Sequence, residues 1–245
     1  MRDIVYFDLE TRHSAAEVGG WHNTAEMRLS VGVTYSTASG KYTIYSEEMV
    51  DDLIRQLSQA DLVVGYNHEH FDYGVLQRYT MWNMIDITNN LDLCKDIEQR
   101  GGVRVKLDSV AAASIGSSKT AVGTQALKWW AEYVQTGNTE LLMDIARYCC
   151  FDVKVTRDVH WYGAEHGFIR YDDKKGGQVE LPVDWKLYFF CGHAWPVLFP
   201  GAGVRLVSLL WRRCRLSRAD TGYQGMAGTE KGFREEADGN CAVAA

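Results

Sequence analysis

Residues with high β propensity form the first clear pattern along the chain. Residues 3–9 (DIVYFDL) are rich in β-branched and aromatic side chains, which suits a central strand. Residues 28–35 and 41–45 are two further runs of this kind, and the segment 36–40 between them has the length and chemistry of a hairpin connection. Residues 61–66 (DLVVGY) are typical of another buried strand. The pattern therefore predicts an antiparallel pair of strands with a buried strand before and after it.

Apolar residues at helical spacing alternate with these strands. Ser46 is a suitable N-cap, and Met49, Leu53, Ile54 and Leu57 then recur at the spacing of a helix. Further helices are predicted at residues 71–79, 107–113, 123–133 and 139–163. Strands that alternate with helices predict an α/β domain with a mixed sheet.

A second hairpin marks the end of the predicted domain. Residues 168–171 and 178–181 flank a turn-forming polar stretch, which predicts a closing pair of strands. From residue 186 onward neither the strand period nor the helix period is sustained, and tryptophan, arginine and proline are scattered. We therefore predict one domain at residues 1–185. Residues 186–245 are interpreted as an irregular tail, either a disordered docking segment or a non-native continuation of the chain, and the pattern favours the latter.

The composition argues against several classes of protein. With 26 basic and 32 acidic residues the net charge is −6, the wrong sign for holding nucleic acid by bulk phosphate neutralisation. The six cysteines have no regular spacing and no CxxC pair, so neither a disulfide framework nor a zinc site is indicated. A signal-peptide pattern is lacking, and glycine and proline interrupt the uncharged run at residues 187–204. We therefore expect a cytoplasmic protein with no membrane partner.

Acidic residues stand near the ends of the predicted elements. Asp8 and Glu10 are two apart on the first strand, so their carboxylates project on one face. Asp72 lies in the first turn of the helix after the fourth strand, where neighbouring strand ends would bring it near Asp8. On the last long helix, Tyr148 and Asp152 are four apart and share a face. Each residue alone is more often a solvated charge or a core aromatic, so the prediction depends on the whole set.

Four clustered carboxylates suit one kind of chemistry. Hard divalent ions such as Mg²⁺ prefer carboxylate oxygen and water as ligands. Two such ions, roughly 3.5 to 4 Å apart, stabilise the attacking and leaving oxygens when a phosphodiester is hydrolysed. Without cations the four acids would repel one another and any phosphate. The set therefore predicts a centre for two divalent cations.

Three segments of the chain, residues 7–11, 67–72 and 148–152, resemble the three exonuclease motifs of the DEDD superfamily. Tyr148 stands where another branch has histidine, which resembles the DEDDy type. The chain is also similar to the ribonuclease H-like predicted exonucleases related to YprB, over residues 60–76, 126–131 and 148–185. The resemblance implies a ribonuclease H-like α/β fold, with a central mixed five-stranded sheet flanked by helices.

The same resemblance implies catalytic roles for individual residues. Asp8, Glu10, Asp72 and Asp152 are expected to hold two Mg²⁺ or Mn²⁺ ions, and Tyr148 to orient or help activate the attacking water. The implied reaction is 3′-to-5′ exonucleolytic hydrolysis that releases 5′-mononucleotides from single-stranded nucleic acid or a free 3′ end.

Contacts to the substrate are also implied by this resemblance. Leu9 is expected to wedge against the terminal base, and Thr11 to contact the terminal nucleotide through its backbone amide. Asn67 is expected to order the turn that holds Asp72. Some of the similar proteins are found with DEAD/DEAH-type helicases, which makes such a helicase a candidate partner.

Several alternatives stay open at this point. The chain could be a catalytically vestigial nucleic-acid-binding or helicase-docking module, and the same fold also accommodates a proofreading enzyme or a structure-specific endonuclease. Trp129 and Trp130 could stack exposed bases, although a core position for one ring is the commoner outcome. Cys149 is expected to be a small buried hydrophobe, and His68 is interpreted as part of a polar loop beside the cleft.

Overall fold

Strands and helices alternate along the described part of the chain. The computed structural model describes residues 2–117, 124–173, 176–186 and 241–243. The strands are β1 (Ile4–Thr11), β2 (Leu29–Ser36), β3 (Lys41–Tyr45), β4 (Leu62–Gly65), β5 (Asn90–Asp92), β6 (Phe168–Asp172), β7 (Gln178–Pro182) and β8 (Cys241–Val243). The α-helices are α1 (Val50–Gln59), α2 (Asp72–Leu76), α3 (Met84–Ile87), α4 (Leu93–Gly101), α5 (Leu107–Ile115), α6 (Gln125–Thr136) and α7 (Glu140–His166), with the 3-10 helices η1 (Trp21–Met27) and η2 (Glu47–Met49).

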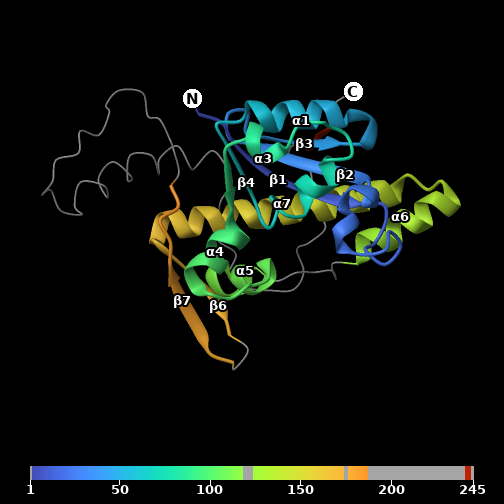
Figure 1. Ribbon diagram of the computed structural model, residues 1–245. Coiled ribbons are helices and arrows are strands. Elements are labelled where there is room, and N and C mark those ends of the chain that lie inside the picture. The colour runs from blue at the N-terminus through green and yellow to red at the C-terminus, as the bar shows by residue number, and fades with distance from the viewer. Residues whose placement is uncertain (1, 118–123, 174–175, 187–240, 244–245) are drawn as a thin grey trace, which may run out of the picture. The chain divides into compact units, whose positions relative to one another are not determined.

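The central sheet is mixed and has the strand order β5-β4-β1-β2-β3-β8, of which β4, β1, β2 and β3 are labelled in Figure 1. β1 is antiparallel to β2 and parallel to β4, and β2 and β3 form the predicted hairpin. The predicted fold class is confirmed, with β1 in the middle of the five strands β5-β4-β1-β2-β3. β8 adds a parallel strand beside β3, so residues 241–243 of the predicted tail belong to this sheet. Residues 187–240 lie outside the described residues, and the prediction for them is not tested.

β1 contributes to the core on both faces of the sheet. Ile4 and Tyr6 pack with residues of α7, whereas Val5 and Phe7 pack with residues of α1 and α2. This alternation follows from the period of a strand. Figure 1 shows α7 and α1 on opposite sides of the sheet. The side chains that follow Tyr6 at spacing two are therefore directed to the α7 side.

Most of the predicted helices are confirmed, with small shifts at their ends. The predicted helices at 107–113, 123–133 and 139–163 correspond to α5, α6 and α7, and the second hairpin is formed by β6 and β7. α2 is shorter than the predicted 71–79. β5 and α4 were not predicted from the sequence. Within the described residues, no helix has the length and apolar character needed to cross a membrane.

A buried hydrogen-bond network joins β1 to α7. Trp161 Nε1 donates to Tyr6 Oη at 2.7 Å, and Tyr6 Oη lies 2.8 Å from His160 Nδ1. Tyr6 and His160 are both fully buried. Burial lowers the pKa of His160 from 6.5 to about 4, so this imidazole is neutral in the folded protein at neutral pH.

Acidification is expected to destabilise the fold through His160. The unfolded chain takes up a proton near pH 6.5, whereas folded His160 does so only near pH 4, so stability is lost as the pH falls through this window. The loss from this group is on the order of 3 kcal/mol. Urea unfolding of the wild type and of His160→Gln across this window measures it. The variant, which cannot titrate at this position, should show the shallower dependence on pH, and equal slopes would contradict the assignment.

Candidate metal centre

The C-terminal half of β1 extends beyond its parallel neighbour. β4 pairs with β1 only at residues 4–6, whereas β2 pairs with β1 as far as Thr11. Beyond the end of β4, the backbone N–H of Leu9 donates a hydrogen bond to Asp72 Oδ1 at 3.1 Å. Because a buried N–H without a partner is costly, this carboxylate replaces the strand that β1 lacks here. Asp72 is therefore fixed beside the end of β1.

Three carboxylates meet on the α7 side of β1. Asp8 and Glu10 follow Tyr6 at spacing two, and Asp152 lies on α7. These three carboxylates each provide an oxygen, and all three oxygens lie within 4.8 Å of one another. Asp152 is buried, and Asp8 and Glu10 are half-buried. We refer to Asp8, Glu10 and Asp152 as the acidic triad.

Asp72 lies beside the acidic triad and is not a member of it. Asp72 begins α2 on the β4 side of the strand, and its side chain is buried. Burial raises the pKa of Asp72 to about 8. The charge of Asp72 in turn contributes to raising the pKa of Asp8, which shows that the two carboxyls interact. The four acids expected to converge are thus arranged as three that meet and a fourth next to them.

The electrostatics of the acidic triad favour a bound cation. Burial raises the pKa of Asp8 well above its usual value, and the neighbouring Asp72, Asp152 and Glu10 raise it further. Like charges at such distances are unfavourable unless a proton or a cation compensates them. The triad offers only carboxylate oxygens, the donors that Mg²⁺ and Mn²⁺ prefer, and not the nitrogen and sulfur donors typical of zinc. The donor set therefore fits a hard divalent cation.

Cys149 contacts the acidic triad from α7. Its side chain is fully buried, as the sequence predicts for a free cysteine. Its Sγ donates hydrogen bonds to the carbonyl oxygen of Asp8 at 3.3 Å and to Asp8 Oδ2 at 3.5 Å. This contact lowers the pKa of Asp8, against the larger effects that raise it. Sequence reasoning missed this role, because the contact joins residues that are far apart in the chain.

Aromatic side chains cover the α7 side of the centre. Tyr148 precedes Asp152 by one helical turn, is buried, and packs edge-to-face with Trp129 at 6.3 Å between ring centroids. The guanidinium of Arg12 lies 4.5 Å from the ring centroid of Trp130. Both tryptophans are half-buried, so neither ring is a fully buried core residue. Trp129 instead supports the ring of Tyr148.

The two residues expected to contact a terminal nucleotide are both buried. Leu9 is 4% exposed and packs with the α1 side of the core, and its expected wedge against a terminal base stays a prediction. Thr11 is also buried, and its Oγ1 donates to the carbonyl of His13 at 3.1 Å. The strand register is irregular between Glu10 and Thr11. The expected role of the Thr11 amide stays a prediction.

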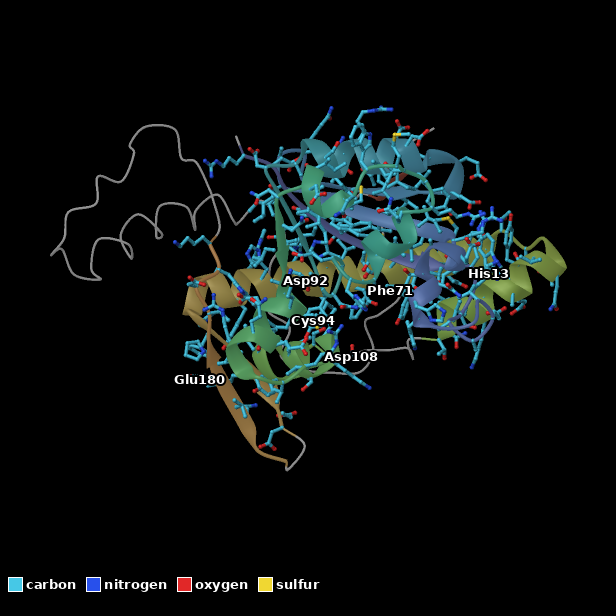
Figure 2. All side chains as sticks on the ribbon, viewed as in Figure 1. His13, Phe71, Asp92, Cys94, Asp108 and Glu180 are labelled. Carbon is cyan, nitrogen blue, oxygen red and sulfur yellow. The ribbon has the colours of Figure 1, made fainter. Side chains whose placement is uncertain are left out.

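Asp92, which the sequence reasoning missed, holds the turn before Asp72. Its carboxylate accepts hydrogen bonds from the backbone N–H groups of Asn67 at 2.7 Å, Glu69 at 3.1 Å and Lys95 at 3.2 Å. Asn67 has a φ of 67°, and its carbonyl oxygen accepts from the N–H of Phe71. Figure 2 labels Phe71 and Asp92, which stand at the N-caps of α2 and α4. Asp92 therefore anchors this turn, and the expected ordering role of Asn67 stays a prediction.

His68 is buried beneath the same turn. It is fully buried, which corrects its interpretation as part of a polar loop beside the cleft. The reason is Gly65, where a Cβ would lie 2.7 Å from the His68 ring, so only glycine leaves room for the imidazole. His68 Nε2 lies 3.3 Å from Asn90 Oδ1, and burial lowers the pKa of His68. The imidazole therefore supports the turn from inside.

The strand order and the acidic triad on the central strand suit the metal-assisted hydrolysis of phosphodiesters. The family model of the RNase H superfamily matches residues 5–161, which run from β1 into α7 and include the acidic triad, Asp72 and Tyr148. The chain belongs to the RNase H superfamily. A comparison with curated proteins gave no match.

Replacing Asp8 with asparagine is expected to stabilise the metal-free protein and to abolish its stabilisation by Mn²⁺. The change removes one of the clustered negative charges and one cation ligand, with little change of shape. At a hundredfold excess over the dissociation constant, Mn²⁺ should stabilise the wild type by about 2.7 kcal/mol. Calorimetric melting with chelator and with Mn²⁺ measures both effects. Asp51→Asn, at an exposed position of α1, is the control and should keep the response to Mn²⁺.

Removing the thiol of Cys149 is expected to weaken cation binding. The thiol positions the carboxylate of Asp8, and loss of a residue that orients a metal ligand reduces affinity by about 10- to 100-fold. Because S–H is a weak donor, we expect Cys149→Ala to lower the affinity for Mn²⁺ by about tenfold. Cys149→Ser, which keeps a hydrogen-bond donor, should lose less affinity. Titration calorimetry with Mn²⁺ measures the affinities. Equal losses in the two variants would show that packing, and not the hydrogen bond, is responsible.

Proposed function

We propose that this member of the RNase H superfamily is a metal-dependent 3′-5′ exonuclease of the DEDDy type. The observation that carries the proposal is the acidic triad on β1 and α7, with Asp72 bonded to the same strand end. Tyr148, one turn before Asp152, supplies the phenol that gives this type its name. The resemblance of the three motifs supports the exonuclease within the broader nuclease family.

Each residue of the centre has a proposed part in hydrolysis. The acidic triad and Asp72 hold two divalent cations, Mg²⁺ or Mn²⁺, which when bound supply charge for the phosphate and activate water. Tyr148 donates or accepts a hydrogen bond that orients the attacking water. Cys149 holds the carboxylate of Asp8 in place through its contact with Oδ2. Asp72 keeps the end of β1 ordered through the N–H of Leu9.

The proposed substrate is single-stranded nucleic acid with a free 3′ end. A net charge of −6 favours binding through cations and local contacts over binding through a broad basic surface. We further propose a DEAD/DEAH-type helicase as a partner, because unwinding supplies single strands, and the cytoplasm as the location. The resemblance to proteins found with such helicases supports this partner.

An exonuclease assay on the full chain tests the proposal. With 5′-labelled single-stranded DNA and RNA in Mn²⁺, the wild type should give a ladder of products shortened stepwise from the 3′ end. Tyr148→Phe should lower kcat by about 10²-fold and leave oligonucleotide affinity unchanged, because only the group that handles the water is lost. Asp8→Ala should be inactive. Tyr162→Phe, which removes a phenol from the far part of α7, should retain full activity.

Three other outcomes would contradict the proposal in different ways. Oligonucleotide binding without cleavage in Mg²⁺ or Mn²⁺ would indicate a vestigial binding or helicase-docking module. Cleavage of circular single strands would indicate an endonuclease, since a circle offers no end. A profile of Tyr148→Phe equal to that of the wild type would remove Tyr148 from the mechanism.

A further inference from the structure

An exposed aromatic ring packs against the residue that precedes Asp72. Trp21, the first residue of η1, is 70% exposed. Its ring meets Phe71 edge-on, with 6.0 Å between the ring centroids. Phe71 directly precedes Asp72, whose carboxylate bonds to Leu9 on β1. The exposed ring of Trp21 is therefore open to a ligand beside the start of α2.

The position of Trp21 is fixed because η1 runs along α2. In the middle of α2, the place that a Cβ would take at Gly74 lies 2.4 Å from Thr24 Oγ1, so glycine leaves room for this side chain of η1. At the far end, Arg78 Nη1 forms an ion pair with Glu26 Oε2 at 2.8 Å. With both of these contacts in place, Trp21 is held at the end of α2 that faces the metal centre.

Rings also lie on the other side of the acidic triad. Trp129 and Tyr148 pack together on α6 and α7, next to Asp152. Of the two aromatic pairs, only the Trp21 and Phe71 pair carries a ring that is mostly exposed. Trp21 is therefore the ring of this set with the largest face open to a ligand.

We propose that Trp21, supported by Phe71, is a stacking platform for an unpaired nucleobase of the strand that is hydrolysed at the acidic triad. This inference rests on the proposed function, and it adds a binding residue outside the acidic motifs. Every base has a π face, so an exposed tryptophan binds single strands with little regard to sequence. The chain has a net charge of −6, so stacking supplies affinity that its overall charge does not. The platform selects unpaired bases, because the bases of a duplex are already stacked.

The chain offers a matched control for this platform. Trp82 is 63% exposed and follows the far end of α2, where Gln77 Nε2 contacts its carbonyl oxygen. Trp82 has the residue type and the high exposure of Trp21. In the sequence it follows the C-terminal end of α2, whereas Asp72 begins that helix. Trp82→Ala therefore removes an equal ring from a different part of the surface.

Oligonucleotide binding by the full chain tests the proposal without hydrolysis. Fluorescence polarisation of labelled oligothymidylate and oligouridylate is measured in Ca²⁺, a hard divalent cation that carboxylates bind and that replaces the catalytic metal, for the wild type, Trp21→Ala, Trp21→Phe and Trp82→Ala. Loss of one stacked base is expected to weaken binding by about 5- to 150-fold in Trp21→Ala. Trp21→Phe should recover most of this loss, and Trp82→Ala should stay within about twofold of the wild type.

A second measurement separates the platform from the chemistry. Thymidine 5′-(p-nitrophenyl phosphate) has one base and no neighbouring nucleotide, so its hydrolysis in Mn²⁺ should be unchanged in Trp21→Ala, while kcat/KM for the oligonucleotide falls. Wild-type affinity in Trp21→Ala, an equal loss in Trp82→Ala, or no oligonucleotide binding by the wild type would overturn the platform. If binding depends on Trp21 but neither substrate is hydrolysed by the wild type, the platform stands and the proposed exonuclease fails.

Discussion

The close approach of three carboxylates at the end of β1 is the constraint on which this structure depends. Like charges in a half-buried place repel one another, and the raised pKa of Asp8 expresses that repulsion. The strand must therefore be held rigidly enough to keep the acids together. Tyr6 does so on the α7 face through His160 and Trp161, and the opposite face is packed against α1 and α2. The core thus holds the three carboxylates together, and a bound cation then neutralises their charge.

The shortness of β4 gives the centre its second structural element. Because β4 ends before β1 does, the N–H of Leu9 needs a partner, and the carboxylate of Asp72 supplies it. The turn that delivers Asp72 is in turn held by Asp92, which binds two backbone N–H groups in that turn. One buried carboxylate therefore positions another, and a change at Asp92 would act on the site without touching a ligand.

How much of this could be predicted from the sequence depends on the range of the interactions. Asp8 and Glu10 share a face through the strand period, and Tyr148 and Asp152 through the helix period, so local spacing was sufficient. β5 is only three residues long, too short to show alternation, so Asp92 gave no strand signal, although its place at the N-cap of α4 is a signal that could have been used. His68 is buried because of Gly65, and Trp21 lies near the site because η1 packs on α2. These contacts are tertiary, and no periodicity encodes them.

An acidic protein that acts on a polyanion must obtain its affinity from something other than its overall charge. Arg12 and Arg28 adjoin the paired ends of β1 and β2, yet both form ion pairs with Glu47. Glu47 therefore largely compensates their charge. The guanidinium of Arg12 also lies over the ring of Trp130. Stacking on an exposed ring needs no net charge and is weakened less by salt than phosphate contacts are. Affinity that depends on a ring and on divalent cations should accordingly vary little with monovalent salt, a behaviour opposite to that of a basic nucleic-acid-binding surface.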